Sequence, residues 1–303
     1  MFCFKKWILE EKGSAALLLA LLMPVFLGFA ALTLDVGKMY IAKQHLIDKA
    51  DTAALAGVQF LPEQPDSAED AAIEYALLNG VENDDVLVSV SEDKTTIEVT
   101  VKDRVRFSFA SIFNQNEATI KAKSKARVGV PKKIKGAQPF AAIKEDFRYG
   151  EIYSLKVGAG DSQQGNFRAL ALGGKGASNY LNNIKYGYQD YLEIGDEVDT
   201  EPGNMKGPTE SGVRYRINQD PYSTFDNFPK NSPRVVYVPI VEDFNVNGRK
   251  KVKIISFGAF FLEDYNSSDE VEGRFIRLLT QGEMMEYNDE IDWGLRVVKL
   301  VKQ

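Results

Sequence analysis

With 303 residues, 44% hydrophobic and 26% charged, the chain has the composition of folded protein and enough length for about two domains. Its net charge of −6 argues against nucleic acid as a partner, because binding to phosphates requires a basic surface. One cysteine, Cys3, and one histidine, His45, exclude an internal disulfide and a zinc site of Cys and His, and leave only His45 as the base of a hydrolase triad.

An uncharged, mostly apolar run from Gly13 to Leu34 is the first predicted element. A helix of about 20 such residues crosses the ~30 Å hydrocarbon core of a bilayer, and membrane helices tolerate a proline such as Pro24. We therefore expect a cytoplasmic tail over 1–12 and a transmembrane helix over 13–34. A signal peptide cleaved near Gly28-Phe29-Ala30 is the alternative, and the length of the run favours retention.

Lysines lie on both sides of this run, so the positive-inside rule does not decide its orientation. Those before it are Lys5, Lys6 and Lys12, and those after it are Lys38, Lys43 and Lys49.

Helical spacing of apolar residues continues beyond Leu34, which predicts a stalk helix over 35–60. The recurring positions are Val36, Met39, Tyr40, Ile47, Ala50, Ala54 and Val58. Alanines at 50, 53, 54 and 56 would let another element approach closely. Two partners suit this face equally well: a helix of another protein, or the chain's own globular domain.

Four motifs stand in order along the predicted helix. They are Gly13-Ser14-Ala15-Ala16, Leu22-Met23-Pro24-Val25, Leu34-Asp35-Val36-Gly37 and the run from Asp48 to Gly57. In this order and spacing they resemble the N-terminal region of TadE/TadG-like proteins of the tight-adherence (Flp) pilus-assembly system. The resemblance implies a cell-membrane protein with one span, the bulk of the chain outside the cytoplasm, and other pilus-assembly or pilin-like membrane proteins as partners.

Two departures refine this resemblance. Prepilin-type members carry a glutamate five residues after the cleaved glycine, whereas Leu18 stands five residues after Gly13. The chain therefore resembles the uncleaved, TadG-like branch. The Asp-x-Ser-x-Ser motif of larger TadG proteins is absent, and Asp161 to Gly165 is the nearest stretch.

A small α+β domain is predicted over 61–130. Its elements are a helix from Asp66 or Ser67 to Leu78, strands around 86–90 and 97–101, a short helix over 107–113 and a strand over 118–130. The lysine-rich stretch 131–137 is expected to be a linker.

The remainder, 138–303, is predicted to be a β-rich extracytoplasmic domain, either a sandwich or a barrel. Its clearest strands are Arg234 to Val241 and Lys251 to Leu262, connected through the turn Asn247-Gly248. Further strands are expected at 152–157, 198, 213–217 and 275–279. The whole chain is thus expected to be α+β.

No catalytic, cofactor-binding or metal-binding residue is predicted. The acidic residues Asp190, Glu193, Asp196, Glu197, Asp199 and Glu201 offer oxygen ligands for Ca²⁺, but their spacing fits no known loop and a solvated edge explains them better. Tyr180, Tyr186, Tyr188 and Tyr191 suit either an aromatic binding surface or core packing. The glycines around Gly173 and Gly176 fail the phosphate-loop pattern and indicate turns.

The function expected from these observations is a membrane-anchored, non-enzymatic component of Flp/Tad-type pilus assembly or surface attachment. Its partners would be membrane lipid and other pilus-assembly or pilin-like proteins, with no nucleic acid and no cofactor. An envelope-attached adhesion or ligand-binding module is the alternative, and an exported hydrolase is the second.

Overall fold

The computed structural model describes residues 11–144, 148–156, 168–201, 204–242, 251–268 and 270–301. Cys3, the stretch from Asp161 to Gly165 and the predicted turn at 247–248 lie outside them. The chain forms two compact units, Met1–Ala126 with Leu300–Gln303, and Arg127–Lys299. The fold is α+β, as expected: the first unit begins with two helices followed by strands, and most elements of the second unit are strands.

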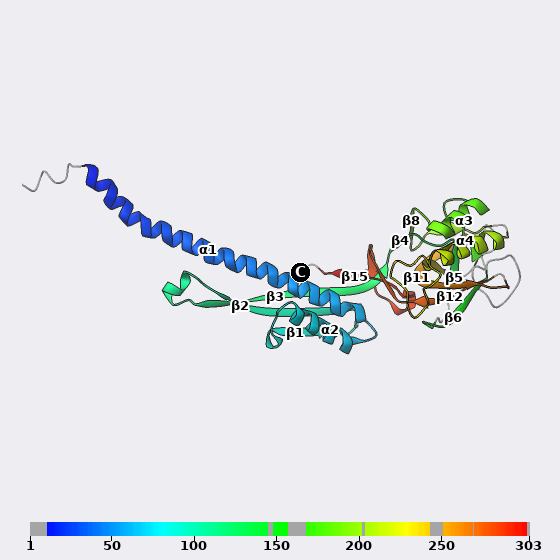
Figure 1. Cartoon of the computed structure of the whole chain (residues 1–303), viewed down its shortest axis with the longest axis horizontal. Coiled ribbons are helices and arrows are strands. Elements are labelled where there is room, and N and C mark those ends of the chain that lie inside the picture. Colours follow the sequence, from blue (N-terminus) through cyan, green and yellow to red (C-terminus); the bar gives the residue numbers. More distant parts are fainter. Residues whose placement is uncertain are drawn as a thin grey trace, which may run out of the picture. The chain divides into compact units, whose positions relative to one another are not determined.

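One helix, α1 (Glu11–Gly57), contains the whole predicted membrane segment and nearly all of the predicted stalk. It continues through Pro24 without a break and is followed by a short 3-10 turn, Val58–Phe60 (Figure 1). From residue 16 to Leu34 its side chains are exposed, apart from the half-buried Ala31. Among the described residues this is the one helix long and apolar enough to cross a membrane.

Beyond Leu34, one side of α1 is buried against its own domain. Asp35, Leu46, Ala50 and Ala53 lie on this side at spacings that keep them on one helix face. The face packs on α2 (Pro65–Leu78) and β2 (Thr96–Arg106). Of the two partners left open for the alanine face, the chain's own domain is therefore the one observed.

At the start of the stalk, the apolar residues of the helix are not the buried ones. Val36 and Tyr40, two of the apolar positions from which the stalk helix was predicted, are 56% and 72% exposed. The helix instead buries Asp35 there, because a carboxylate can be buried when backbone donors satisfy it.

The rest of the first unit follows the predicted order. Strand β1 (Val86–Val90) pairs antiparallel with β2, and β2 neighbours β3 (Glu117–Pro131) in the sheet. Alternate β2 residues Ile97, Val99 and Val101 are buried. On the opposite face, Glu98 forms ion pairs with Lys123 and Lys125 at 2.5 and 2.8 Å. The short helix expected over 107–113 is a 3-10 turn, η3 (Ala110–Phe113).

In the part of the second unit that the structure describes, the main element is a seven-stranded sheet. Its central antiparallel pair is β10 (Val235–Val241) and β11 (Lys251–Tyr265), as predicted from their apolar runs. The other strands are β12 (Glu270–Ile276), β6 (Ile152–Lys156), β5 (Phe140–Ile143), β7 (Arg168–Ala169) and β9 (Glu197–Asp199).

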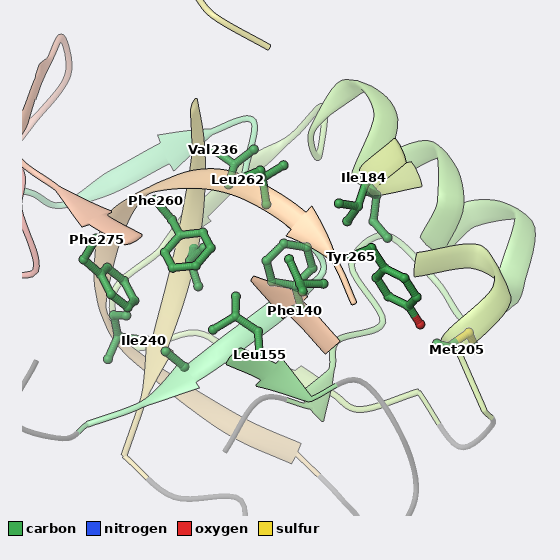
Figure 2. Packing of buried hydrophobic residues seen from close by; sticks show 14 of the residues in the cluster. Phe140, Leu155, Ile184, Met205, Val236, Ile240, Phe260, Leu262, Tyr265 and Phe275 are labelled. Atoms are coloured by element: carbon green, nitrogen blue, oxygen red, sulfur yellow. The ribbon is translucent and has the colours of Figure 1, made fainter. Parts of the chain in front are cut away.

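Both faces of β11 are buried, which explains its nearly continuous apolar sequence. Phe260 lies in one core cluster with Phe140, Leu155 and Phe275 (Figure 2), whereas the next residue, Phe261, lies in the other. Successive side chains of a strand point to opposite faces, so the sheet separates two cores.

Two helices cover one face of this sheet, which corrects the expected sandwich or barrel. They are α3 (Ala177–Tyr186) and α4 (Lys206–Gln219), which pack together, and α4 also packs on β11 and β12. Residues 213–217, predicted as a strand, lie inside α4. The polar composition of α4 conceals its helical periodicity, because few of its residues reach the core.

Short strands occupy the stretch expected to be a linker. Within 131–137, β4 (Lys133–Lys135) pairs antiparallel with β8 (Tyr191–Glu193), and Ile134 and Ala137 are buried. The remaining strands are β13 (Leu278–Thr280), β14 (Met284–Glu286), which pairs with the end of β3, and β15 (Leu295–Leu300). Alternation in a three-residue strand is too short to recognise in a sequence.

We predict that Gly57→Ala destabilises the first unit. A Cβ at Gly57 would lie 2.5 Å from the carbonyl oxygen of Ala68 and 2.5 Å from Cδ1 of Ile97. Gly37→Ala is the matched control, because a Cβ at Gly37 meets nothing within 4 Å. Alanine favours a helix over glycine by up to about 1 kcal/mol, so the control should unfold at the same temperature or higher.

Thermal unfolding of the full-length protein in detergent, followed by circular dichroism, measures both variants. A lower midpoint for Gly57→Ala alone is the expected result. An equal response of the two variants would contradict the close packing at Gly57.

Candidate functional site

The candidate site lies where the uncharged run ends, at Asp35. This carboxylate is only 3% exposed. It accepts hydrogen bonds from the backbone N–H groups of Ser108 at 2.8 Å, Phe109 at 3.0 Å and Ala110 at 2.8 Å. The tip of the β2–β3 hairpin, residues 107–116, is thereby fixed beside the first turn of α1 after Leu34.

The hairpin tip needs such an acceptor because its 3-10 turn leaves N–H groups without partners in the turn itself. The residue preceding the turn, Phe109, has no side-chain oxygen to cap it. Asp35, more than 70 residues earlier in the chain, supplies both carboxylate oxygens instead. A carboxylate at such a site also interacts favourably with the partial positive charge of the turn's N-terminus.

Two lysines of α1 extend the attachment of the hairpin. Lys38 donates from Nζ to the carbonyl oxygen of Arg106 at 2.7 Å, and Lys43 donates to the carbonyl oxygen of Lys121. Asp35, Lys38 and Lys43 therefore hold successive levels of the hairpin along α1.

The environment of Asp35 keeps its carboxylate ionised. The hydrogen bond from Ser108 lowers the pKa of Asp35 most, and those from Ala110 and Phe109 and the charge of Lys38 add to it. Burial acts in the opposite direction but is outweighed. With its lone pairs directed at three backbone donors, this carboxylate positions the hairpin; its geometry is that of a structural acceptor.

The acidic residues weighed above as ligands for Ca²⁺ take part in turns and ion pairs. Glu193 pairs with Lys132 at 2.8 Å, and Asp196 accepts from the backbone of Glu193. Glu201 accepts from the backbone N–H of Gly176 at 3.0 Å, at the start of α3. Among the described residues no three His, Cys, Asp or Glu side chains gather where they could hold a metal ion.

The four tyrosines do not form one aromatic surface. Tyr180 is buried in the core, where its hydroxyl contacts that of Thr209 at 3.2 Å. Tyr186 packs edge-on against Tyr215. Tyr191 is exposed and lines a groove of about 570 Å³ in the second unit, with Lys133, Lys135, Tyr237 and residues 280–283.

The glycines near α3 have the conformation that the sequence predicted. Gly173, Gly174 and Gly176 have φ angles of 72°, 129° and 122°, which favour glycine and shape the turn into α3. His45 is exposed on α1.

Asp35 belongs to one of the four motifs in the sequence, but its structural role was not predicted. An acidic residue directly after an uncharged run was the available signal. Its partners were not identifiable, because backbone N–H groups carry no sequence signature.

Comparison with known families confirms the resemblance at this end of the chain. Residues 13–59 match the family model described as "Putative Flp pilus-assembly TadE/G-like". The match covers most of α1, including Asp35, and supports a role related to Flp pilus assembly. Comparisons with curated proteins and with solved structures gave no match.

We predict that Asp35→Asn lowers thermal stability in a pH-dependent way. An asparagine side chain has one acceptor oxygen and an N–H₂ group, so it cannot accept from all three backbone donors. Because the pKa of Asp35 is lowered from 3.8 by folding, the ionised carboxylate stabilises the fold above that value. The contribution is lost as the pH falls through the folded-state pKa.

The measurement compares unfolding midpoints of wild type and Asp35→Asn at about pH 7 and about pH 3. The difference between the two unfolding midpoints should be largest at neutral pH and smaller at acidic pH. Asp103→Asn, on the same hairpin and exposed, is the control and should show little gap at either pH. A gap at Asp35 that stays constant with pH would refute the role of its charge.

Proposed function

We propose that this protein is a membrane-anchored, non-enzymatic component of Flp/Tad-type pilus assembly that acts through contacts of its folded units outside the cytoplasm. The observation that carries the proposal is the change in α1 at Asp35. Before this residue the helix exposes an apolar surface on all sides, and after it the same helix packs into a folded domain. The family match covers both parts.

Lipid is the partner that suits the exposed half of α1. Leu17, Phe26 and Phe29 are each more than 60% exposed, and their neighbours resemble them. Burying such surface contributes about 25 cal/mol per Å², and an uncovered band of this size in water would promote aggregation. A bilayer would bury the whole band at once.

The proposal of a non-enzymatic role is supported by how the reactive side chains are used. The single histidine stands exposed on α1, and the described carboxylates considered above accept hydrogen bonds or pair with lysines. The carboxylate of Asp35 attaches the β2–β3 hairpin to α1.

Contacts with pilin-like partners would use surfaces other than the alanine face of α1. That face is covered by α2 and β2 of the same chain. The exposed surface before Asp35, within the bilayer, and the outer units therefore remain for partner proteins.

We predict the topology from labelling with a membrane-impermeant maleimide. Cys3 is the only cysteine, and Tyr222 is 93% exposed in the second unit. In protoplasts or spheroplasts, a Cys3→Ser, Tyr222→Cys variant should be labelled, whereas wild-type Cys3 should react only after lysis. Labelled Cys3 on the full-length protein would also exclude cleavage of the apolar run. The reverse labelling pattern would overturn the proposed orientation.

We predict that deletion of the gene abolishes surface pili and that the full-length chain restores them. A second variant is the informative comparison. In it, a cleavable signal peptide replaces residues 13–34, so that the same outer units are exported without an anchor. This variant should not restore pili, and electron microscopy of the cells checks the result. Restoration by the released form would overturn the anchored role. Pili that persist after deletion, together with lost attachment, would favour an adhesion module instead.

A further inference from the structure

The tip of the β2–β3 hairpin lies level with Asp35, the residue at which the uncharged run of α1 ends. The uncharged run of 22 residues spans about 33 Å as a helix, against a core of ~30 Å. Asp35 follows it directly. The three hydrogen bonds to Asp35 bring Ser108, Phe109 and Ala110 to this same level.

The side chains at this level suit a lipid headgroup layer. Phe109 is 39% exposed at the tip, and Tyr40 is 72% exposed on α1. Tyr40 lies about 7.5 Å along the helix from Asp35, at the outer limit of the ~5–7.5 Å that each headgroup layer adds in a ~40–45 Å bilayer. Aromatic side chains concentrate in this region because it accepts both their apolar and their polar parts.

Basic side chains surround the same tip although the chain as a whole is acidic. Arg104, Arg106 and Lys121 are exposed on the hairpin, and Lys38 and Lys43 are exposed on the facing turns of α1. The exposed acids on the hairpin are Asp103 and Glu117, and Glu82 and Asp85 line the same pocket as Arg104 and Arg106. Asp35 contributes a negative charge, but its oxygens face backbone donors. Basic residues next to a membrane surface attract anionic lipid headgroups.

We propose that the β2–β3 hairpin tip docks on the anionic lipid surface of the membrane that α1 spans. Phe109 enters the headgroup layer, Arg104 and Arg106 contact lipid phosphates, and Asp35 sets the depth of the tip. The inference rests on the proposed membrane anchor and adds a second lipid contact to it. Two contacts fix the tilt of the first unit on the membrane, which a single helix does not.

Spin labels at single cysteines test the docking in the full-length protein. In a Cys3→Ser background, Phe109→Cys, Phe60→Cys and Phe26→Cys are labelled and reconstituted into phosphatidylcholine nanodiscs with and without phosphatidylglycerol. Phe60 is the matched control, since it is 41% exposed at the far end of α1. Phe26, 68% exposed within the apolar run, reports on the anchor itself.

Relative access of oxygen and of a water-soluble nickel complex gives the depth of each label. Labels at 26 and 109 should favour oxygen and the label at 60 should favour nickel, with deeper placement of 109 in anionic discs. Adding Arg104→Gln and Arg106→Gln should remove that lipid dependence. If the label at 26 favours oxygen but the label at 109 behaves like the label at 60, the docking proposal is wrong and the proposed membrane anchor is supported. If the label at 26 favours nickel, the apolar run does not lie in the bilayer and the proposed membrane anchor is wrong.

Discussion

The carboxylate of Asp35 is the interaction on which the first unit depends. It joins two segments more than 70 residues apart and does so with both oxygens, so the hairpin tip can neither slide along α1 nor rotate away from it. An unpaired carboxylate at the end of an apolar helix would have to remain hydrated. Directed at three backbone donors, it can lie nine-tenths buried or more, and it satisfies groups on the hairpin that would otherwise require water.

The same helix performs two tasks with different residues. Before Asp35, large apolar side chains point outward in all directions. After it, small residues bring α2 and the sheet within close reach, and Gly57 leaves no room even for a methyl group. A continuous helix transmits position along its length, so the folded unit is held at a set distance from the apolar segment.

The sequence predicted best the elements that are long and strongly patterned. The apolar run, the stalk helix, α2 and the strands predicted at 86–90, 97–101 and 118–130, which correspond to β1, β2 and β3, were identified from the periodicity of their apolar residues. The helix α4 was mistaken in part for a strand, since its few buried residues, such as Val213 and Arg216, do not form an apolar stripe. Tertiary contacts determine such elements, and one sequence alone does not reveal them.

The site at Asp35 was not predicted from the sequence. The motif around Asp35 was recognisable, whereas its pairing with Ser108 and Ala110 required the hairpin to fold back beside α1. The alanine face shows the same limit: its small residues indicated a close neighbour, and only the fold showed that the neighbour belongs to the same chain.

The division of the chain has a mechanical and temporal consequence. The chain leaves the first unit after Ala126 and returns to it at Leu300, where the N–H of Val301 donates to the carbonyl oxygen of Lys125. The second unit is thus inserted into the first in the sequence, and the backbone connects the two units at two points. A force applied to the second unit is therefore shared between two backbone connections. During synthesis, the first unit gains its contact with Val301 only after the whole second unit has been made.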